Sequence, residues 1–231
     1  METVKKIYIL HGWAYTTEKW GPFVDGLVKL GYTPVLLKIP GLTAPIDRAW
    51  HLDDYVSWLA ETLKGETGPV IILGHSNGGR IAVVYAEKFP QKVSRLILVD
   101  SAGVYHRDMK TKAKRKFFGA ISKLTAPLKK SEFLRRFLYT IIRETDYLHA
   151  NPIMQETMRN LIAVDLVPVL KHISIPVLLI WGKDDTATPL SDGAIMAKEF
   201  PNAKLEIIVG ARHSPQFTHV AQVLSTIGKN I

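Results

Sequence analysis

Cysteine is absent from this 231-residue sequence. The absence excludes disulfides, thiol nucleophiles and cysteine-ligated metal sites. Long hydrophobic runs are also missing: the four-residue run at 7–10 is too short for the core of a signal peptide, and no run elsewhere could cross a bilayer. We therefore expect a cytoplasmic protein. Its hydrophobic content of 47% and charged content of 22% are ordinary for a globular fold.

Acidic residues are fewer than basic ones, and the imbalance is concentrated in one segment. The net charge is +9, and residues 105–150 carry +8 of it. A charge asymmetry this sharp indicates a separate module. Apolar residues interleave with these charges at helical spacing, which makes the segment amphipathic. It is either a solvated surface or one that attracts an acidic partner. Nucleic acid is not expected, because no recognition motif accompanies the charge.

Short apolar runs alternate with helix-like segments along most of the chain. Strands that are apolar on both faces predict a parallel sheet of about six strands, covered by helices on both sides. The expected strands are 4–10, 33–39, 69–73, 93–100, 176–181 and 204–209. The expected helices are 18–30, 51–63, 77–89, 191–200 and 216–227. Between 103 and 170 no strand is evident, and helices are expected over 112–124, 132–143 and 154–163.

One strand is followed by a very sharp turn with a serine at its apex. The segment from Val70 to Arg80 reads V-I-I-L-G-H-S-N-G-G-R, a buried strand that stops abruptly and gives way to a helical pattern. A strained turn of this kind lifts the hydroxyl of Ser76 clear of its own backbone. Gly74 and Gly78 flank the serine, and we expect that a Cβ at either position would collide across the turn.

An acid and a histidine follow two later strands, so the order along the chain is serine, acid, histidine. A serine hydroxyl needs a base to remove its proton, and the base needs a carboxylate to orient it. His213 fits the base, and Asp184 or Asp185 fits the acid. Asp100 also ends a strand, but we expect it to cap the following turn rather than to serve as the acid. The backbone N–H groups of Trp13 and Asn77 are the expected oxyanion donors, because each follows the end of a strand at the same edge of the sheet.

The remaining histidines have structural roles in this interpretation. We expect His11 and His75 to make supporting hydrogen bonds beside the site, and His219 to lie on the surface of the final helix. No cluster has metal-ligand spacing, so no metal is inferred.

Four motifs together resemble the α/β-hydrolase superfamily: H-G-W at 11–13, G-H-S-N-G-G at 74–79, W-G-K-D-D-T-A-T-P at 181–189 and G-A-R-H-S-P at 210–215. The resemblance covers nearly the whole chain. In that family the acid lies three residues after the glycine and four before the proline, which selects Asp185. The resemblance implies an α/β-hydrolase core over 1–102 and 171–231, with a helical, basic lid inserted at 103–170.

The function implied is hydrolysis of a carboxylic ester through an acyl-serine intermediate, without a cofactor. The lid residues Phe117, Phe118, Leu124 and Phe137 are candidates for an acyl pocket. The sequence is similar to esterases that cleave the methyl ester of a carrier-bound dicarboxylate, and the basic lid would suit an acidic carrier protein or an anionic membrane surface. The same triad could instead serve C–C bond hydrolysis, perhydrolysis or acyl transfer. A binding module without catalysis is the remaining alternative.

Overall fold

The computed structural model of this protein describes residues 5–105 and 152–231. The expected helices at 112–124 and 132–143 lie outside the described residues. The candidate pocket residues Phe117, Phe118, Leu124 and Phe137 lie outside them as well.

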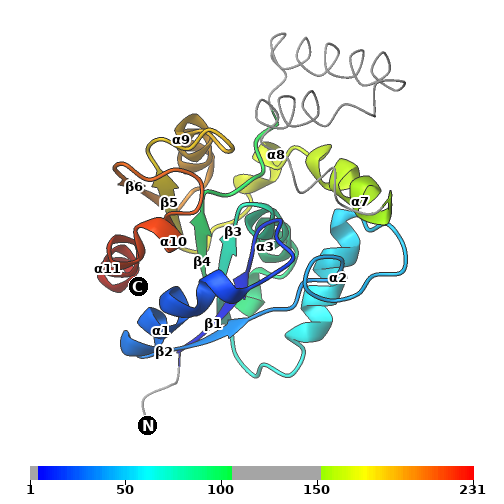
Figure 1. Cartoon of the computed structure of the whole chain (residues 1–231), viewed down its shortest axis with the longest axis horizontal. Coiled ribbons are helices and arrows are strands. Elements are labelled where there is room, and N and C mark those ends of the chain that lie inside the picture. Colours follow the sequence, from blue (N-terminus) through cyan, green and yellow to red (C-terminus); the bar gives the residue numbers. More distant parts are fainter. Residues whose placement is uncertain (1–4, 106–151) are drawn as a thin grey trace, which may run out of the picture.

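A single parallel sheet forms the centre of the molecule (Figure 1). Its six strands confirm the predicted number and positions. They are β1 (Lys5–Leu10), β2 (Tyr32–Leu36), β3 (Val70–His75), β4 (Val93–Val99), β5 (Val177–Gly182) and β6 (Ala203–Ile208). Every residue of β3 and β5 is buried, as expected for inner strands covered on both faces.

In the strand order β2-β1-β3-β4-β5-β6, the chain adds β2 on one side of β1 and all later strands on the other side. The order therefore has a switch point between β1 and β3. In open parallel sheets a ligand crevice lies beyond the carboxyl ends of the strands at such a switch point. The register aligns these ends: Leu10 pairs with Gly74, His75 with Val99, and Gly182 with Ile208. Residues that directly follow β1, β3, β4, β5 and β6 therefore meet at one edge of the sheet.

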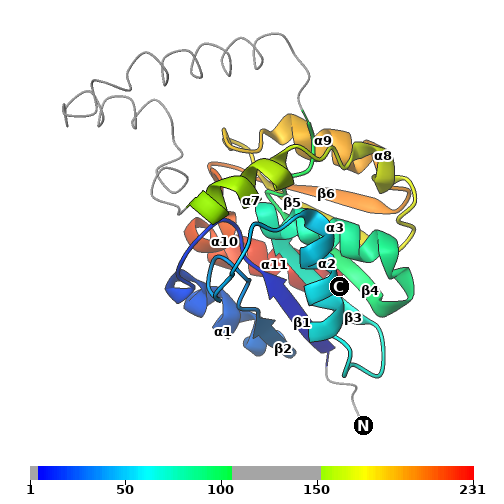
Figure 2. The same ribbon diagram turned by 90° about the vertical axis from the view of Figure 1, so that its right-hand side faces the viewer.

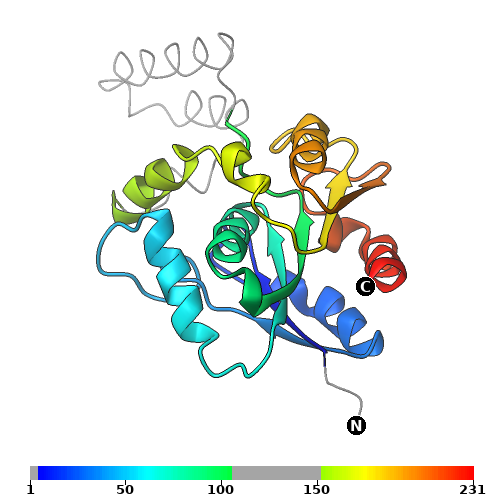
Figure 3. The ribbon, with the colours of Figure 1, turned by 180° about the vertical axis from the view of Figure 1, so that it is seen from behind.

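Helices cover both faces of the sheet, as Figure 1 and the reverse view in Figure 3 show. One face carries α1 (Gly21–Lys29), preceded by a 3₁₀ turn η1 (Glu18–Trp20), together with α10 (Pro215–Thr218) and α11 (Val220–Asn230). The other face carries α2 (Leu52–Thr62), α3 (Asn77–Lys88), α8 (Val167–Leu170) and α9 (Leu190–Glu199). A second 3₁₀ turn, η2 (Pro90–Lys92), leads into β4.

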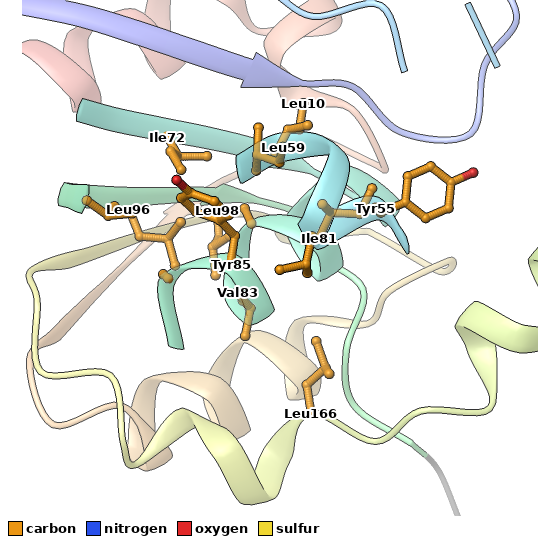
Figure 4. Packing of buried hydrophobic residues seen from close by; sticks show 14 of the residues in the cluster. Leu10, Tyr55, Leu59, Ile72, Ile81, Val83, Tyr85, Leu96, Leu98 and Leu166 are labelled. Carbon is orange, nitrogen blue, oxygen red and sulfur yellow. The ribbon is translucent and has the colours of Figure 1, made fainter. Parts of the chain in front are cut away.

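The core on the α2–α3 face is made of side chains that meet between strand and helix (Figure 4). Leu10 and Ile72 from the sheet lie with Leu59 of α2 and Ile81 of α3 in one cluster, and all four are fully buried. Burying a side chain of this size stabilises the fold by about 1.5–3 kcal/mol. This cluster fixes α3, and with it the turn that precedes α3, against the sheet.

The end of the insertion packs on the same cluster. Helix α7 (Pro152–Ile162) contributes Met154 and Leu161, and the following segment contributes Leu166 and Leu170, all of them buried. Figure 2 shows α7 beside α2. Thr157 Oγ1 of α7 accepts a hydrogen bond from the backbone N–H of Trp50, two residues before α2. The proposed domain boundary at 103 and 170 stays a prediction. Within 5–105 and 152–231, no helix combines the length and apolar character that spanning a membrane would need.

The predicted final helix at 216–227 is wrong in one respect. The chain forms α10, leaves helical geometry at His219 (φ −132°, ψ 44°), and then forms α11. Packing overrides local propensity here, because Phe217 of α10 contacts the ring of Trp20 while α11 packs on α1. His219 lies at this break and contacts Thr218 Oγ1, so it is at the surface as expected, but it lies between two helices rather than within one.

We predict that Gly78→Ala lowers the free energy of unfolding by at least about 2 kcal/mol, because a Cβ there would lie 2.1 Å from the backbone oxygen of Leu10. Gly65→Ala is the matched control, since no heavy atom lies within 4 Å of its Cβ position. Urea unfolding of both variants measures the difference. Equal stability of the two variants would contradict the close approach.

Candidate active site

Ser76 occupies a strained backbone position at the end of β3. Its φ of 52° and ψ of −119° lie in a region that residues other than glycine rarely adopt. Strain of this kind costs about 1–3 kcal/mol and persists only when the surroundings fix it. Three backbone hydrogen bonds do so: Ser76 N–H donates to Val99 O (3.1 Å), and Gly79 N–H and Ala102 N–H both donate to Ser76 O (3.0 Å each). The half-buried serine is thereby held at the edge of the sheet.

Glycines allow the backbone to pass close to Ser76. A Cβ on Gly74 would lie 2.5 Å from Gly79 Cα, which confirms the expected collision across the turn. For Gly78 the explanation is different, because its Cβ would strike the carbonyl groups that end β1 rather than its own turn. Gly12 is equally restricted: a Cβ there would lie 3.0 Å from the Cβ of Ser76. The loop after β1 is therefore pressed directly against the serine.

Asp185 and His213 form a hydrogen-bonded pair at the same edge. His213 Nδ1 lies 2.8 Å from Asp185 Oδ2, and a carboxylate acceptor requires the proton on Nδ1. The side chain of Asp185 is 0% exposed and that of His213 is 28% exposed, so the pair opens to solvent only through the imidazole. Asp184, the alternative acid, is exposed. The structure thus brings Asp185, and not Asp184, to the histidine.

Several donors surround the Asp185 carboxylate. Burial raises the pKa of Asp185, but hydrogen bonds from His213, Thr188 and Ala187 outweigh that effect and hold the pKa below its ordinary value. Thr188 Oγ1 lies 2.8 Å from Asp185 Oδ2, and Ala187 N–H donates to Oδ1 at 2.7 Å. The carboxylate is therefore charged at neutral pH and available to stabilise a histidine cation.

Among the described residues no hydrogen bond joins Ser76 to His213, but the residues next to them in the sequence are in contact. His75, which directly precedes the serine, has its ring centroid 5.0 Å from that of His213. His75 Nε2 also lies 3.1 Å from Ser214 Oγ, which directly follows His213. The hydrogen bond between a nucleophile and its base is often long or absent in structures without substrate. Because Nδ1 faces Asp185, Nε2 is the nitrogen that remains for the serine proton.

The two backbone donors expected for an oxyanion lie beside Ser76. Asn77 begins α3, and Trp13 follows Gly12, whose Cα approaches the serine closely. In the part of the chain that the structure describes, neither backbone N–H donates to a protein acceptor. Both are thus available to an oxygen that develops negative charge at the serine.

His11 and His75 have the supporting roles that the sequence predicted. His11 lies 2.9 Å from Thr43 Oγ1 through Nε2 and 2.8 Å from Gly12 O through Nδ1, which fixes the loop after β1. Burial lowers the pKa of His11. Burial also places the pKa of His75 well below its ordinary value, with smaller contributions from His213 and His11. Both side chains are therefore neutral near physiological pH.

Asp100 does not cap the following turn, so that prediction is wrong. Its carboxylate accepts hydrogen bonds from the backbone N–H of Gly182 (2.8 Å, Oδ1) and of Ser214 (2.9 Å, Oδ2). Asp100 is fully buried, and its own φ is +43°. The backbone turn points the carboxylate away from residues 101–103 and toward the ends of two other segments.

Asp100, Asp185 and His213 are close enough to suggest a metal site, because one potential ligand atom of each lies within 4.8 Å of the others. The hydrogen bonds argue against this use. Both oxygens of Asp100 accept backbone N–H groups, and both oxygens of Asp185 accept donors as well. The three residues form a hydrogen-bonded network rather than an open set of ligands.

Two residues near the site escaped the sequence analysis. Thr188 is one, since a threonine three residues after an acid carries no distinctive signal. Arg80 is the other: it lies one turn after Ser76 on α3, is almost fully buried, and donates from Nη1 to Val164 O at 2.6 Å. Burial lowers the pKa of Arg80 to about 10, so it remains charged. A charged residue within an apolar helical face was the signal that could have identified it.

Comparison with known proteins places this geometry in context. The sequence profile described as "Alpha/beta hydrolase family" matches residues 7–226. A pimeloyl-(acyl-carrier protein) methyl ester esterase of Legionella pneumophila (strain Corby) is 26% identical over 221 residues, covering 92% of this chain and 89% of that protein. A 2-hydroxy-6-oxononadienedioate/2-hydroxy-6-oxononatrienedioate hydrolase of Dechloromonas aromatica is 27% identical, covering 94% and 83%. A thermophilic esterase from Thermogutta terrifontis shares the fold, with a TM-score of 0.72 at 19% identity, covering 98% and 89%.

We predict that Thr188→Val lowers the free energy of unfolding at neutral pH by about 1–2 kcal/mol, because it removes a donor from a buried carboxylate. The lowered pKa of Asp185 gives stability that is complete above the ordinary carboxyl pKa and is lost as pH falls through the lowered one. The deficit should therefore shrink below about pH 4. Urea unfolding across pH measures it, with Thr188→Ser as the control that keeps the hydroxyl. A deficit that is independent of pH would contradict this assignment.

Proposed function

The chain belongs to the alpha/beta hydrolase family, and we propose that it hydrolyses carboxylic esters with Ser76 as nucleophile, His213 as base and Asp185 as the acid that orients His213. The observation that carries the proposal is the Asp185–His213 hydrogen bond of 2.8 Å, formed at the edge where the strained turn presents Ser76. The residues alone would also serve other acyl reactions. The relatives named as esterases favour ester hydrolysis among them.

The reaction follows from the groups present. Ser76 Oγ attacks the ester carbonyl carbon, and its proton passes to His213 Nε2. The backbone N–H groups of Trp13 and Asn77 bind the oxyanion of the tetrahedral intermediate. His213 then returns the proton to the departing alkoxide, which leaves as the alcohol. Water repeats these steps on the acyl-serine, releases the carboxylic acid and restores Ser76, so no cofactor takes part.

The charges around His213 suit this cycle. Asp185 is ionised beside Nδ1 and stabilises the imidazolium that forms when the serine proton is taken. His75, the nearest other imidazole, has its pKa lowered well below the ordinary value by burial. It therefore stays neutral and adds no positive charge that would oppose the imidazolium. The arrangement lowers the energy of the charged intermediate without a second imidazolium beside His213.

We further propose that the substrate is an ester whose acyl chain is attached to an acidic carrier protein. Two observations support this class: relatives named for esters on acyl-carrier protein, and the +8 charge of residues 105–150. Opposite charges steer association and raise the rate of encounter. The acyl pocket at Phe117, Phe118, Leu124 and Phe137 and an anionic membrane as the partner remain predictions.

The alternative functions are not favoured. C–C bond hydrolysis, perhydrolysis and acyl transfer use the same triad, but the relatives named as esterases point to ester cleavage. A binding module without catalysis would have no need for a serine held in a strained turn beside an oriented Asp185–His213 pair.

We predict that the wild type hydrolyses p-nitrophenyl esters of short to medium acyl chains and that Ser76→Ala lowers kcat by at least about 10⁴-fold. A fluorophosphonate should label Ser76 in the wild type only. Asp185→Asn should lose about 10⁴-fold in kcat, because it favours the wrong histidine tautomer.

The matched control for the acid is Asp184→Asn, which removes the same charge from the neighbouring exposed residue. It should retain kcat within about threefold. The enzyme proposal fails if the wild type is inert toward these esters and takes no label. The choice of acid fails if Asp184→Asn proves the more damaging of the two.

For the carrier, the test substrate is a methyl ester on an acyl chain attached to acyl-carrier protein. We predict that its kcat/KM is at least about tenfold above that of the same ester without the protein. This difference in kcat/KM should decline as salt is added. Replacing Lys114, Arg115 and Lys116 by Gln should remove much of it. Replacing the exposed Lys29, Lys171 and Lys198 by Gln is the control outside the segment. An equal rate with and without the carrier would refute this partner. Binding to anionic vesicles instead would favour a membrane.

A further inference from the structure

A third carboxylate lies behind the Asp185–His213 pair and belongs to neither half of it. Asp100 follows β4, the strand between those that lead to Ser76 and to Asp185. It is fully buried, and its backbone adopts a positive φ of 43°, which is rare for a residue with a side chain. Its N–H donates to Ile180 O at 3.0 Å, so the residue is anchored on β5 before its side chain is considered. A strained, buried acid of this kind calls for a specific role.

The side chain joins the two segments that carry the pair. Oδ1 accepts the N–H of Gly182, three residues before Asp185, and Oδ2 accepts the N–H of Ser214, directly after His213. Ser214 has a φ of 90°, so this contact fixes an unusual conformation right beside the histidine. The Asp100 carboxylate therefore sets the separation between the segment from Gly182 to Asp185 and the segment of His213 and Ser214.

The backbone oxygen of Asp100 adds a third connection. Thr188 Oγ1, which lies 2.8 Å from Asp185 Oδ2, also lies 3.1 Å from Asp100 O. On the opposite side, Ser214 Oγ meets His75 Nε2 at 3.1 Å, next to Ser76. Asp100 is thus connected to the acid, to the base and, through Ser214, to the segment that carries the nucleophile.

We propose that Asp100 is a positioning residue of this active site: its carboxylate holds the ends of the Asp185 and His213 segments at the separation that their hydrogen bond requires. The inference rests on the proposed function, because it concerns the geometry of that triad. Asp100 touches no reacting atom in this role. It acts through Gly182 and Ser214, the residues whose N–H groups it accepts.

Ionisation of Asp100 makes this role depend on pH. Burial is the main cause that raises the pKa of Asp100 to about 7, and the charge of Asp185 raises it further. The two backbone donors and His213 act in the opposite direction and lower it. The charged groups that face Asp100 are therefore Asp185 from the segment after β5 and His213 from the segment after β6, and His75 beside them is neutral. Protonation turns one carboxyl oxygen into an O–H donor and so weakens one of the two N–H contacts. The carboxylate is therefore about half ionised at pH 7, and the positioning is lost as the pH falls below that value.

The test is a comparison of pH–rate profiles for wild type and Asp100→Asn with a p-nitrophenyl ester. An amide can accept one of the two N–H groups and not both. We expect kcat to fall by about 10- to 100-fold, with KM within about threefold of wild type, because a small misplacement of the base harms the reaction more than binding. In a plot of log kcat/KM against pH, the acid limb should have a slope above 1 in the wild type. In Asp100→Asn the slope should be 1, because the ionisation of Asp100 has been removed.

Leu96→Ala is the stability control, because Leu96 is fully buried in the middle of the same strand, four residues before Asp100. It should lower the melting temperature while kcat stays near the wild-type value. A loss of kcat in Asp100→Asn no greater than in Leu96→Ala would overturn the proposal. If Asp100→Asn does not fold, the wild-type profile alone decides: a slope above 1 supports the proposal, and a slope of 1 overturns it.

A double-mutant cycle with Asp185→Asn separates positioning from an independent contribution. Once Asp185 no longer orients His213, Asp100 has no pair to position, so the two losses should combine to much less than their product. Losses that multiply fully would contradict the inference.

A measurement without turnover separates this inference from the proposed function. The proton between His213 Nδ1 and Asp185 Oδ2 should give a low-field ¹H resonance that shifts or broadens in Asp100→Asn and stays in place in Leu96→Ala. If the wild type cleaves no ester but the resonance responds in this way, the proposed function fails and the positioning role stands. If the wild type is active and the resonance is unchanged in Asp100→Asn, the positioning role fails alone.

Discussion

The close backbone approach around the end of β3 is the constraint on which the site depends. Ser76 can hold a φ of 52° only because Gly74 and Gly79 meet across the turn and Gly78 lies against the end of β1. The same contact brings Gly12 and the N–H of Trp13 beside the serine. A side chain at any of these glycines would separate Ser76 from the proposed oxyanion donors. The strain is balanced by the buried core that fixes α3 against the sheet.

The electrostatics of the site follow from how each polar group is solvated. Three histidines and two buried acids crowd one edge of the sheet, yet burial keeps His11 and His75 neutral and raises the pKa of Asp100. Asp185 alone has enough donors to remain charged well below neutral pH. His213 is the histidine with both a charged partner and access to solvent. Differences in burial and hydrogen bonding thus assign different roles to chemically similar residues.

The sequence predicted those features that depend on local pattern and chain order. The predicted bounds of the strands agree with the observed ones within a few residues. The positions of Ser76, Asp185 and His213 could be predicted because each follows a strand within a recognisable motif. The role of Asp100 was missed because its partners Gly182 and Ser214 are 82 and 114 residues away. The break at His219 depends on packing against Trp20, which no local signal reveals. Non-local hydrogen bonds and packing therefore mark the boundary of what the sequence alone could predict.

The ends of the inserted segment are tied to α3, the helix that follows Ser76. Arg80, one turn after Ser76, donates to Val164 O, and Leu166 N–H donates to Gly103 O at 2.9 Å. Asp165 accepts the N–H of Tyr105 at 3.3 Å, so the entry and exit of the insertion are joined to each other. Burying the Arg80 guanidinium is unfavourable, and the Nη1 bond to Val164 O and the charge of Asp165 offset part of this cost. The described ends of the insertion, at Gly103 and Tyr105 on one side and at 164–166 on the other, are thereby held next to α3 and to each other.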